Sequence, residues 1–158
     1  MRFLTTLLAL LALLAGCSTV DVGRAPVLAA DAQWAVLPFA NHTETPQAGL
    51  RAESIAETLF EPMDRKQADA ALAWARGAGI RYALTGSVDE WRYKVGVDGE
   101  PAAGVTLQLI DVASGDVLWA AAGGATGWSR EALSAVAQKL MRRLIAPIMP
   151  APRQAKAS

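Results

Sequence analysis

Side chains that commonly carry catalysis or bind metals are scarce in this chain of 158 residues, since cysteine and histidine occur once each, as Cys17 and His42. A single histidine excludes a site with two histidine metal ligands, and we expect His42 to be a loop residue. The segment around Ser129, Gly-Trp-Ser-Arg-Glu, lacks the second glycine of a nucleophile elbow. Asp89 and Glu90 are neighbours on a predicted strand and should point to opposite faces. We therefore predict no catalytic residue, no metal and no cofactor.

The single cysteine closes an N-terminal run of Leu and Ala that follows Arg2. A positive residue, a short apolar stretch and small residues before a cleavage position are typical of a secretory signal. The stretch is too short for a spanning helix, which needs about 20 apolar residues. Leu14 to Cys17 resemble the bacterial lipobox, and that resemblance implies cleavage before Cys17, lipidation of its thiol and acylation of the new amine. The alternative is a secreted protein with a chance cysteine.

A lipidated Cys17 would leave the mature protein without a thiol for disulfides or metal binding. Ser18 comes next, and by analogy with lipoprotein sorting it favours lipid anchoring in the outer membrane, with the protein on the periplasmic face. We expect four segments: a lipoprotein signal peptide at 1–16, a lipidated tether at 17–32, a single α/β domain at 33–149 and a disordered tail at 150–158.

The charges balance in number, but they are unevenly distributed. Fifteen Lys and Arg face fifteen Asp and Glu, so no basic field points to nucleic acid as a partner. Acids predominate from Glu44 to Asp116, and bases predominate after Arg130. Two interpretations fit this distribution. Either the charges simply cover solvent-exposed faces, which is the ordinary case, or the folded molecule has one acidic and one basic end.

Hydrophobic periodicity predicts two helices in the first half of the domain. The apolar run 34–39 predicts a buried strand. Thr45 and Pro46 then predict a helix start, as N-cap and first helical residue. A second helix should begin at Asp64 and end near Gly77.

The second half of the chain predicts an antiparallel meander followed by a helix. Strands are expected at 81–95, from Val105 and at 117–122, with turns at 96–104 and 113–116. Ser129 is expected to cap the last helix. Its apolar stripe consists of Leu133, Val136, Ala137, Leu140, Leu144 and Ile148. The fold class is thus α/β, an α+β sandwich with a mixed, mainly antiparallel sheet packed by about three helices.

Trp128 differs from the strand tryptophans, which we expect in the core or on a sheet face. It lies in a strand-to-helix turn beside Arg130, and such turns normally lie at the surface. An exposed Trp there suits a membrane interface, where its amphipathic ring prefers the headgroup level. The alternative is a Trp folded back over the last helix as a staple.

Two acids, Asp98 and Glu100, lie in the turn between the first two strands of the meander. Plain turn chemistry explains them, because Asp-Gly is a common turn pair. In a closed ring, however, the turn would repeat around the axis and form a ring of negative charge that attracts cations.

Several segments resemble one group of envelope lipoproteins. Residues 34–41, 82–88 and 111–119 are similar to the CsgG and LpoB group, and the more specific segments 41–49, 90–101 and 127–133 resemble the PelC family of Pel exopolysaccharide export. One departure is expected. The group normally has a strand after its first helix, and we expect this chain to be shortened by one strand after Leu59.

The resemblance implies a dodecameric ring at the periplasmic side of the outer membrane. The ring would work with a PelB-like porin and guide a cationic polysaccharide to its exit in biofilm matrix formation. By motif match, Asp98 and Glu100 would be the guiding acids, and Trp128 with Arg130 would contact the membrane. The rival function is an LpoB-type activator of a peptidoglycan synthase, which needs no ring.

Overall fold

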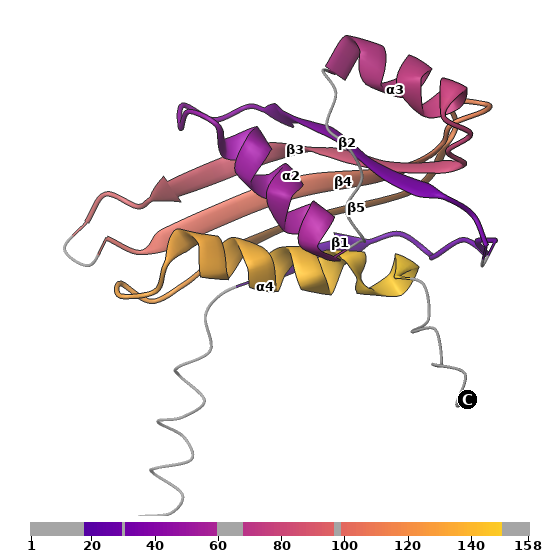
Figure 1. The fold of residues 1–158 in the computed structure, drawn as a ribbon. Helices are drawn as coiled ribbons and strands as arrows, with labels where there is room; N and C mark the ends of the chain where they lie inside the picture. The colour runs from indigo at the N-terminus through magenta and orange to yellow at the C-terminus, as the bar shows by residue number, and fades with distance from the viewer. Residues whose placement is uncertain (1–17, 30, 60–67, 97–98, 150–158) are drawn as a thin grey trace, which may run out of the picture.

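The computed structural model describes residues 18–29, 31–59, 68–96 and 99–149 (Figure 1). These form a five-stranded sheet with the order β1-β5-β4-β3-β2. Strands β2 and β3 are parallel, and the other three pairings are antiparallel. The strands are β1 (Ser18–Val22), β2 (Trp34–Asn41), β3 (Tyr82–Tyr93), β4 (Pro101–Asp111) and β5 (Val117–Thr126). The helices are α2 (Ala48–Leu59), α3 (Ala68–Gly77) and α4 (Leu133–Ile145), which continues into a 3-10 turn (Ala146–Ile148).

The predicted fold class is confirmed, and the helices cover the sheet unequally. Helices α2 and α4 lie across one face, whereas α3 packs at the β2 edge of the opposite face (Figure 1). Successive strand residues point to opposite faces. Leu84 therefore lies in the main core under α2 and α4, while its neighbour Ala83 packs with Ala71 and Ala75 of α3. Among the described residues, no helix covers the rest of this second face, which is called the open sheet face below.

A bulge in β3 shapes the end of the sheet that matters below. Val88 and Trp91 are three residues apart, yet both side chains lie in the main core. Strict alternation would separate them, but the register of β3 against β4 shifts between Val88 and Glu90. Such a shift places an extra residue in one strand and re-aims the side chains around it.

Strand β1 corrects the expected tether at 17–32. Ser18–Val22 pair in antiparallel register with β5, from Ser18 opposite Ala125 to Val22 opposite Ala121. The pairing satisfies backbone groups of β5 that an edge strand would leave exposed. Val22 also packs against the main core. Ser18–Val22 thus already belong to the sheet.

Both predicted N-caps on described helices were wrong. Helix α2 begins at Ala48, because Gln47 has a left-handed φ of 62° that no helix accepts. The Thr45 hydroxyl instead donates to the carbonyl oxygen of Trp91 at 2.5 Å. Helix α4 begins at Leu133, and its N-cap is Ala132 rather than Ser129.

Strand bounds also moved. Strand β4 begins at Pro101, inside the expected turn 96–104, and β5 runs four residues beyond Ala122. Several expectations lie outside the described residues: the signal peptide 1–16, Cys17, the Asp64 cap, Asp98, the tail 150–158 and, at 60–67, the expected loss of a strand after Leu59. No helix within the described ranges is long and apolar enough to span a membrane.

Candidate functional site

The β3–β4 loop and the β5–α4 turn lie at one end of the sheet. The backbone N–H of Gly127 donates to the carbonyl oxygen of Pro101 at 2.9 Å, and that of Lys94 donates to Glu100 at 2.7 Å. An antiparallel meander places alternate connections at the same end, which is why residues 26 positions apart meet here. Glu100 and Trp128 are the chain neighbours of the two residues in this backbone contact, so they lie at the same end of the sheet. Glu100 is exposed, and its predicted partner Asp98 lies outside the described ranges.

Trp128 is exposed at the tip of the β5–α4 turn. Its side chain is 53% accessible, and Arg130 is exposed beside it. This exposure favours a surface residue over a Trp folded back on α4. The turn is closed by the N–H of Glu131, which donates to the carbonyl oxygen of Trp128 at 2.8 Å. Lys139 donates to the Glu131 carboxylate at 2.5 Å and holds the pKa of Glu131 below its usual value.

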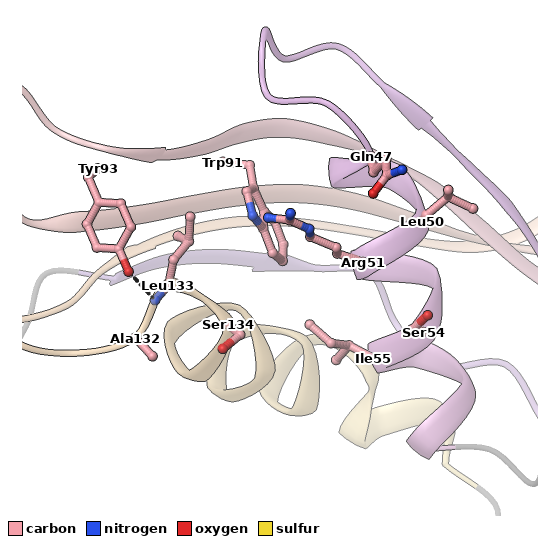
Figure 2. A pocket seen from close by; sticks show the side chains of 10 residues that line it. All are labelled: Gln47, Leu50, Arg51, Ser54, Ile55, Trp91, Tyr93, Ala132, Leu133 and Ser134. Atoms are coloured by element: carbon pink, nitrogen blue, oxygen red, sulfur yellow. Dashed lines mark hydrogen bonds between the residues drawn. The ribbon is translucent and has the colours of Figure 1, made fainter.

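The start of α4 is tied to the end of β3. The N-cap residue, Ala132, has no polar side chain that could accept a hydrogen bond from the first helical N–H groups. Instead, the Tyr93 hydroxyl accepts a hydrogen bond from the N–H of Leu133 at 3.2 Å (Figure 2). The first N–H groups of a helix have no acceptor within the helix, and this bond supplies one for Leu133. Helix α4 and the turn before it are thereby fixed to the strand that leads into the acidic loop.

A groove lies between α2 and the start of α4 (Figure 2). Its volume is about 630 Å³; Trp91 is buried beneath it, and Leu50 and Tyr93 are each about half exposed at its sides. The lining residues are Gln47, Leu50, Arg51, Ser54, Ile55, Trp91, Tyr93, Ala132, Leu133 and Ser134. None of them is a histidine, cysteine or carboxylate, so the groove offers apolar contact but no general base.

A polar cluster that the sequence did not reveal lies at the open sheet face. One oxygen of Asp89 lies 3.0 Å from Nδ1 of His42 and accepts from the Ser87 hydroxyl at 3.0 Å. The other oxygen accepts from the Thr106 hydroxyl at 2.9 Å. Burial raises the pKa of Asp89, but the hydrogen bonds from Thr106, His42 and Ser87 outweigh it and leave that pKa below its usual value.

The cluster orients a carboxylate and activates no nucleophile. Both hydroxyls donate to Asp89, and neither donates to His42, so the nucleophile–base bond of a catalytic triad is missing. Asp89 opens instead onto a shallow hollow of about 430 Å³, which also contains Asp21. Within the described part of the chain, no three potential metal ligands come together.

Basic side chains gather elsewhere, on the outer face of α4. Lys139, Arg142 and Arg143 are exposed there. Nη1 of Arg143 donates to the hydroxyl of Ser18, the first residue of β1, at 2.6 Å.

Comparison with solved structures finds close relatives. The PelC dodecamer from Paraburkholderia phytofirmans is 46% identical, with a TM-score of 0.78, and the match covers 85% of this chain and 99% of that chain. A methionine variant of the same PelC, also a dodecamer, matches at 46% identity and a TM-score of 0.79 over 85% of this chain and 100% of that chain. Lipoprotein GNA1162 from Neisseria meningitidis is 14% identical with a TM-score of 0.48, over 73% and 96% of the two chains. Neither a protein-family model nor a curated protein matches the chain.

Proposed function

The chain belongs to the PelC family, and from that premise we propose that it is a non-enzymatic outer-membrane lipoprotein whose periplasmic ring guides a cationic, Pel-like exopolysaccharide to its export porin during biofilm matrix formation. The observation that carries the proposal is the 46% identity over the full length of PelC chains that are dodecamers. At that identity, the same fold and mode of assembly are the expectation.

In a ring of identical subunits, the charged β3–β4 loop is repeated around the axis. In a closed ring, each subunit presents its β3–β4 loop in the same orientation to the axis. Glu100 is exposed on this loop, and Asp98 lies two residues before it. Twelve such loops would form a belt of carboxylates that raises the local concentration of a cationic polymer. Because salt screens exposed charges beyond about 8 Å at physiological strength, this guidance should weaken at high ionic strength.

Guidance of a moving chain requires weak, repeated contacts rather than a deep site, since tight binding would stop passage. Glu100 fits this requirement, because it is exposed on a loop and not enclosed in a pocket. The carboxylates Asp21 and Asp89 on the open sheet face are arranged around a shallow hollow in the same manner. The proposed polymer is therefore contacted and released without chemical change.

Membrane attachment would combine lipid and protein contacts. Acyl chains on Cys17 would anchor the mature chain stably, because several chains bind far more strongly than one. Trp128 and Arg130 would add a contact at headgroup level, which their exposure at the tip of the β5–α4 turn supports.

The mass of the protein in solution tests the ring. We would measure the mature chain carrying Cys17→Ser, which prevents lipidation, by light scattering after size exclusion. A species near twelve subunits is expected. A monomer would contradict the proposal and favour the LpoB-type activator instead.

Deletion of the gene tests the export role. The expected result is loss of secreted polysaccharide and its restoration by the wild-type chain. Normal secretion without the protein would show that export does not need it, whatever its oligomeric state.

A further inference from the structure

The outer face of α4 is a concentrated basic surface. Lys139, Arg142 and Arg143 fall within an arc of about 100°, at 3.6 residues per helical turn, opposite the buried stripe. Glu131 is the single acid among residues 130–149, and Lys139 already pairs with it. Within the described residues, neither Arg142 nor Arg143 has a carboxylate partner. Both guanidinium groups therefore have N–H donors that no carboxylate among the described residues accepts from.

Ser18, the residue after the proposed lipid attachment point, lies directly beside this basic surface. Arg143 donates to the hydroxyl of Ser18 at 2.6 Å. Ser18 follows Cys17, and consecutive Cα atoms are about 3.8 Å apart. The lipidated residue would therefore leave the domain next to Arg143. Its acyl chains enter the bilayer, so Arg143 must lie near the headgroups.

The N-terminal end of α4, opposite the end that contains Arg143, follows the turn with the exposed Trp128. Leu133 and Arg143 are ten positions apart, which corresponds to about 15 Å along the helix axis. Figure 1 shows α4 running along one side of the molecule, with β1 beside it and the β5–α4 turn at its start. Ser18 pairs with Ala125, three residues before Trp128, and Arg143 reaches Ser18 from the far part of α4. A membrane that meets this part of the molecule can therefore also meet the exposed basic face of α4.

We propose that Lys139, Arg142 and Arg143 form a docking surface for the phosphate groups of anionic phospholipids. This inference rests on the proposed lipidation of Cys17, and it fixes which side of each subunit faces the membrane. Arginine suits the ligand, because its planar fork binds phosphate oxygens through two parallel hydrogen bonds. Each basic residue near an anionic membrane strengthens binding by about fivefold.

Vesicle co-sedimentation tests the surface apart from the lipid anchor. The protein is the mature chain with Cys17→Ser, and the vesicles contain phosphatidylethanolamine with or without phosphatidylglycerol. The double variant Arg142→Gln, Arg143→Gln should bind the anionic vesicles at least about 25-fold more weakly, at fivefold per charge. The matched control is Arg81→Gln, Arg92→Gln, which removes the same charge from two exposed arginines, one just before β3 and one near its end, where Arg92 pairs with Glu90. It should bind like the parent chain.

Three results would overturn the inference. The first is equal binding of the double variant and its parent to anionic vesicles, and the second is equal weakening by the control pair. The third is loss of the oligomer in the Arg142, Arg143 variant, measured by light scattering, since the face would then be a subunit contact. None of these results depends on polysaccharide secretion, so failure of the export proposal would be seen separately.

Discussion

Replacing Gly127 by alanine tests how tightly the turn that carries Trp128 is built. A Cβ atom at this position would lie 2.5 Å from Cγ2 of Val136 and 2.6 Å from Oε2 of Glu131. Val136 is 3% exposed and β-branched, so its methyl group has no other rotamer to adopt readily. The Glu131 side chain is held by Lys139. The added methyl group must therefore push the turn away from α4.

The expected cost follows from these contacts. Inserting a methyl group into a packed site costs about 1–3 kcal/mol, and the smaller conformational freedom of unfolded alanine returns about 0.4–1 kcal/mol. We expect Gly127→Ala to lower the free energy of unfolding by about 1.3 kcal/mol, the middle of the range of about 0–2.6 kcal/mol that these two figures give. Gly124→Ala is the matched control three residues earlier in β5, because its nearest atoms lie at 3.8 and 3.9 Å. That variant should be as stable as the parent or slightly more stable.

Urea unfolding followed by tryptophan fluorescence measures the difference. The mature chain with Cys17→Ser is used at one fixed concentration, because the stability of an oligomer depends on its concentration. For a urea m-value of about 2 kcal/mol per molar, a loss of 1 kcal/mol lowers the midpoint by about 0.5 M. Equal midpoints for Gly127→Ala and Gly124→Ala would refute the tight packing of this turn.

Three further predictions concern charge, membrane contact and pH. Reversing the loop charge by Asp98→Lys should impair polysaccharide export at normal oligomer mass, and unchanged secretion would remove this loop from the mechanism. Trp128→Ala should reduce the fraction of protein bound to vesicles while its oligomer mass and unfolding midpoint stay unchanged; an unfolded variant would show that Trp128 is a core residue. The folded pKa of Asp89 is lowered, so its contribution to stability is complete above the ordinary value of 3.8 and is lost as the pH falls through the folded value. Asp89→Asn should therefore lower the urea midpoint at neutral pH, and the gap from the parent should narrow below pH 3.8; a constant gap would contradict this.

The sequence predicted those helices and strands whose own residues show a regular hydrophobic period. All six residues of the α4 stripe, from Leu133 to Ile148, are buried as expected. The meander was predicted because its strands alternate and its turns contain glycine and aspartate. Strand β1 was missed because its five residues gain order from pairing with β5, about a hundred positions along the chain. No local window contains that partner.

The predicted caps failed because other contacts competed for the same groups. Thr45 has the right chemistry for an N-cap, but its hydroxyl bonds to Trp91 across the sheet end. Ser129 has the same chemistry, yet the turn that it occupies continues to Ala132, and Tyr93 from β3 supplies the hydrogen-bond acceptor instead. In both cases a long-range contact replaced a local rule.

The Asp89 cluster depended on two features that sequence reasoning does not supply. His42 follows β2, and the parallel pairing of Asn41 with Val88 brings it next to Asp89. The bulge after Val88 then sets how Asp89 lies relative to Ser87 and Thr106. By contrast, the exposure of Trp128 followed from its place in a strand-to-helix turn, which is a local property.

The two charged surfaces in the proposals must act without cancelling each other. The acidic loop lies at the Tyr93 end of α4, where Tyr93 contacts the first helical residue, Leu133. Arg143 lies about 15 Å along the helix from that contact, which is about twice the screening length of about 8 Å at physiological ionic strength. Loop carboxylates can therefore attract a cationic polymer while Arg142 and Arg143 hold anionic lipid. If Trp128 lies at headgroup level, the backbone bond from Gly127 to Pro101 brings the acidic loop close to the membrane as well. The polymer would then meet the carboxylates near the mouth of the porin rather than at the far rim of the ring.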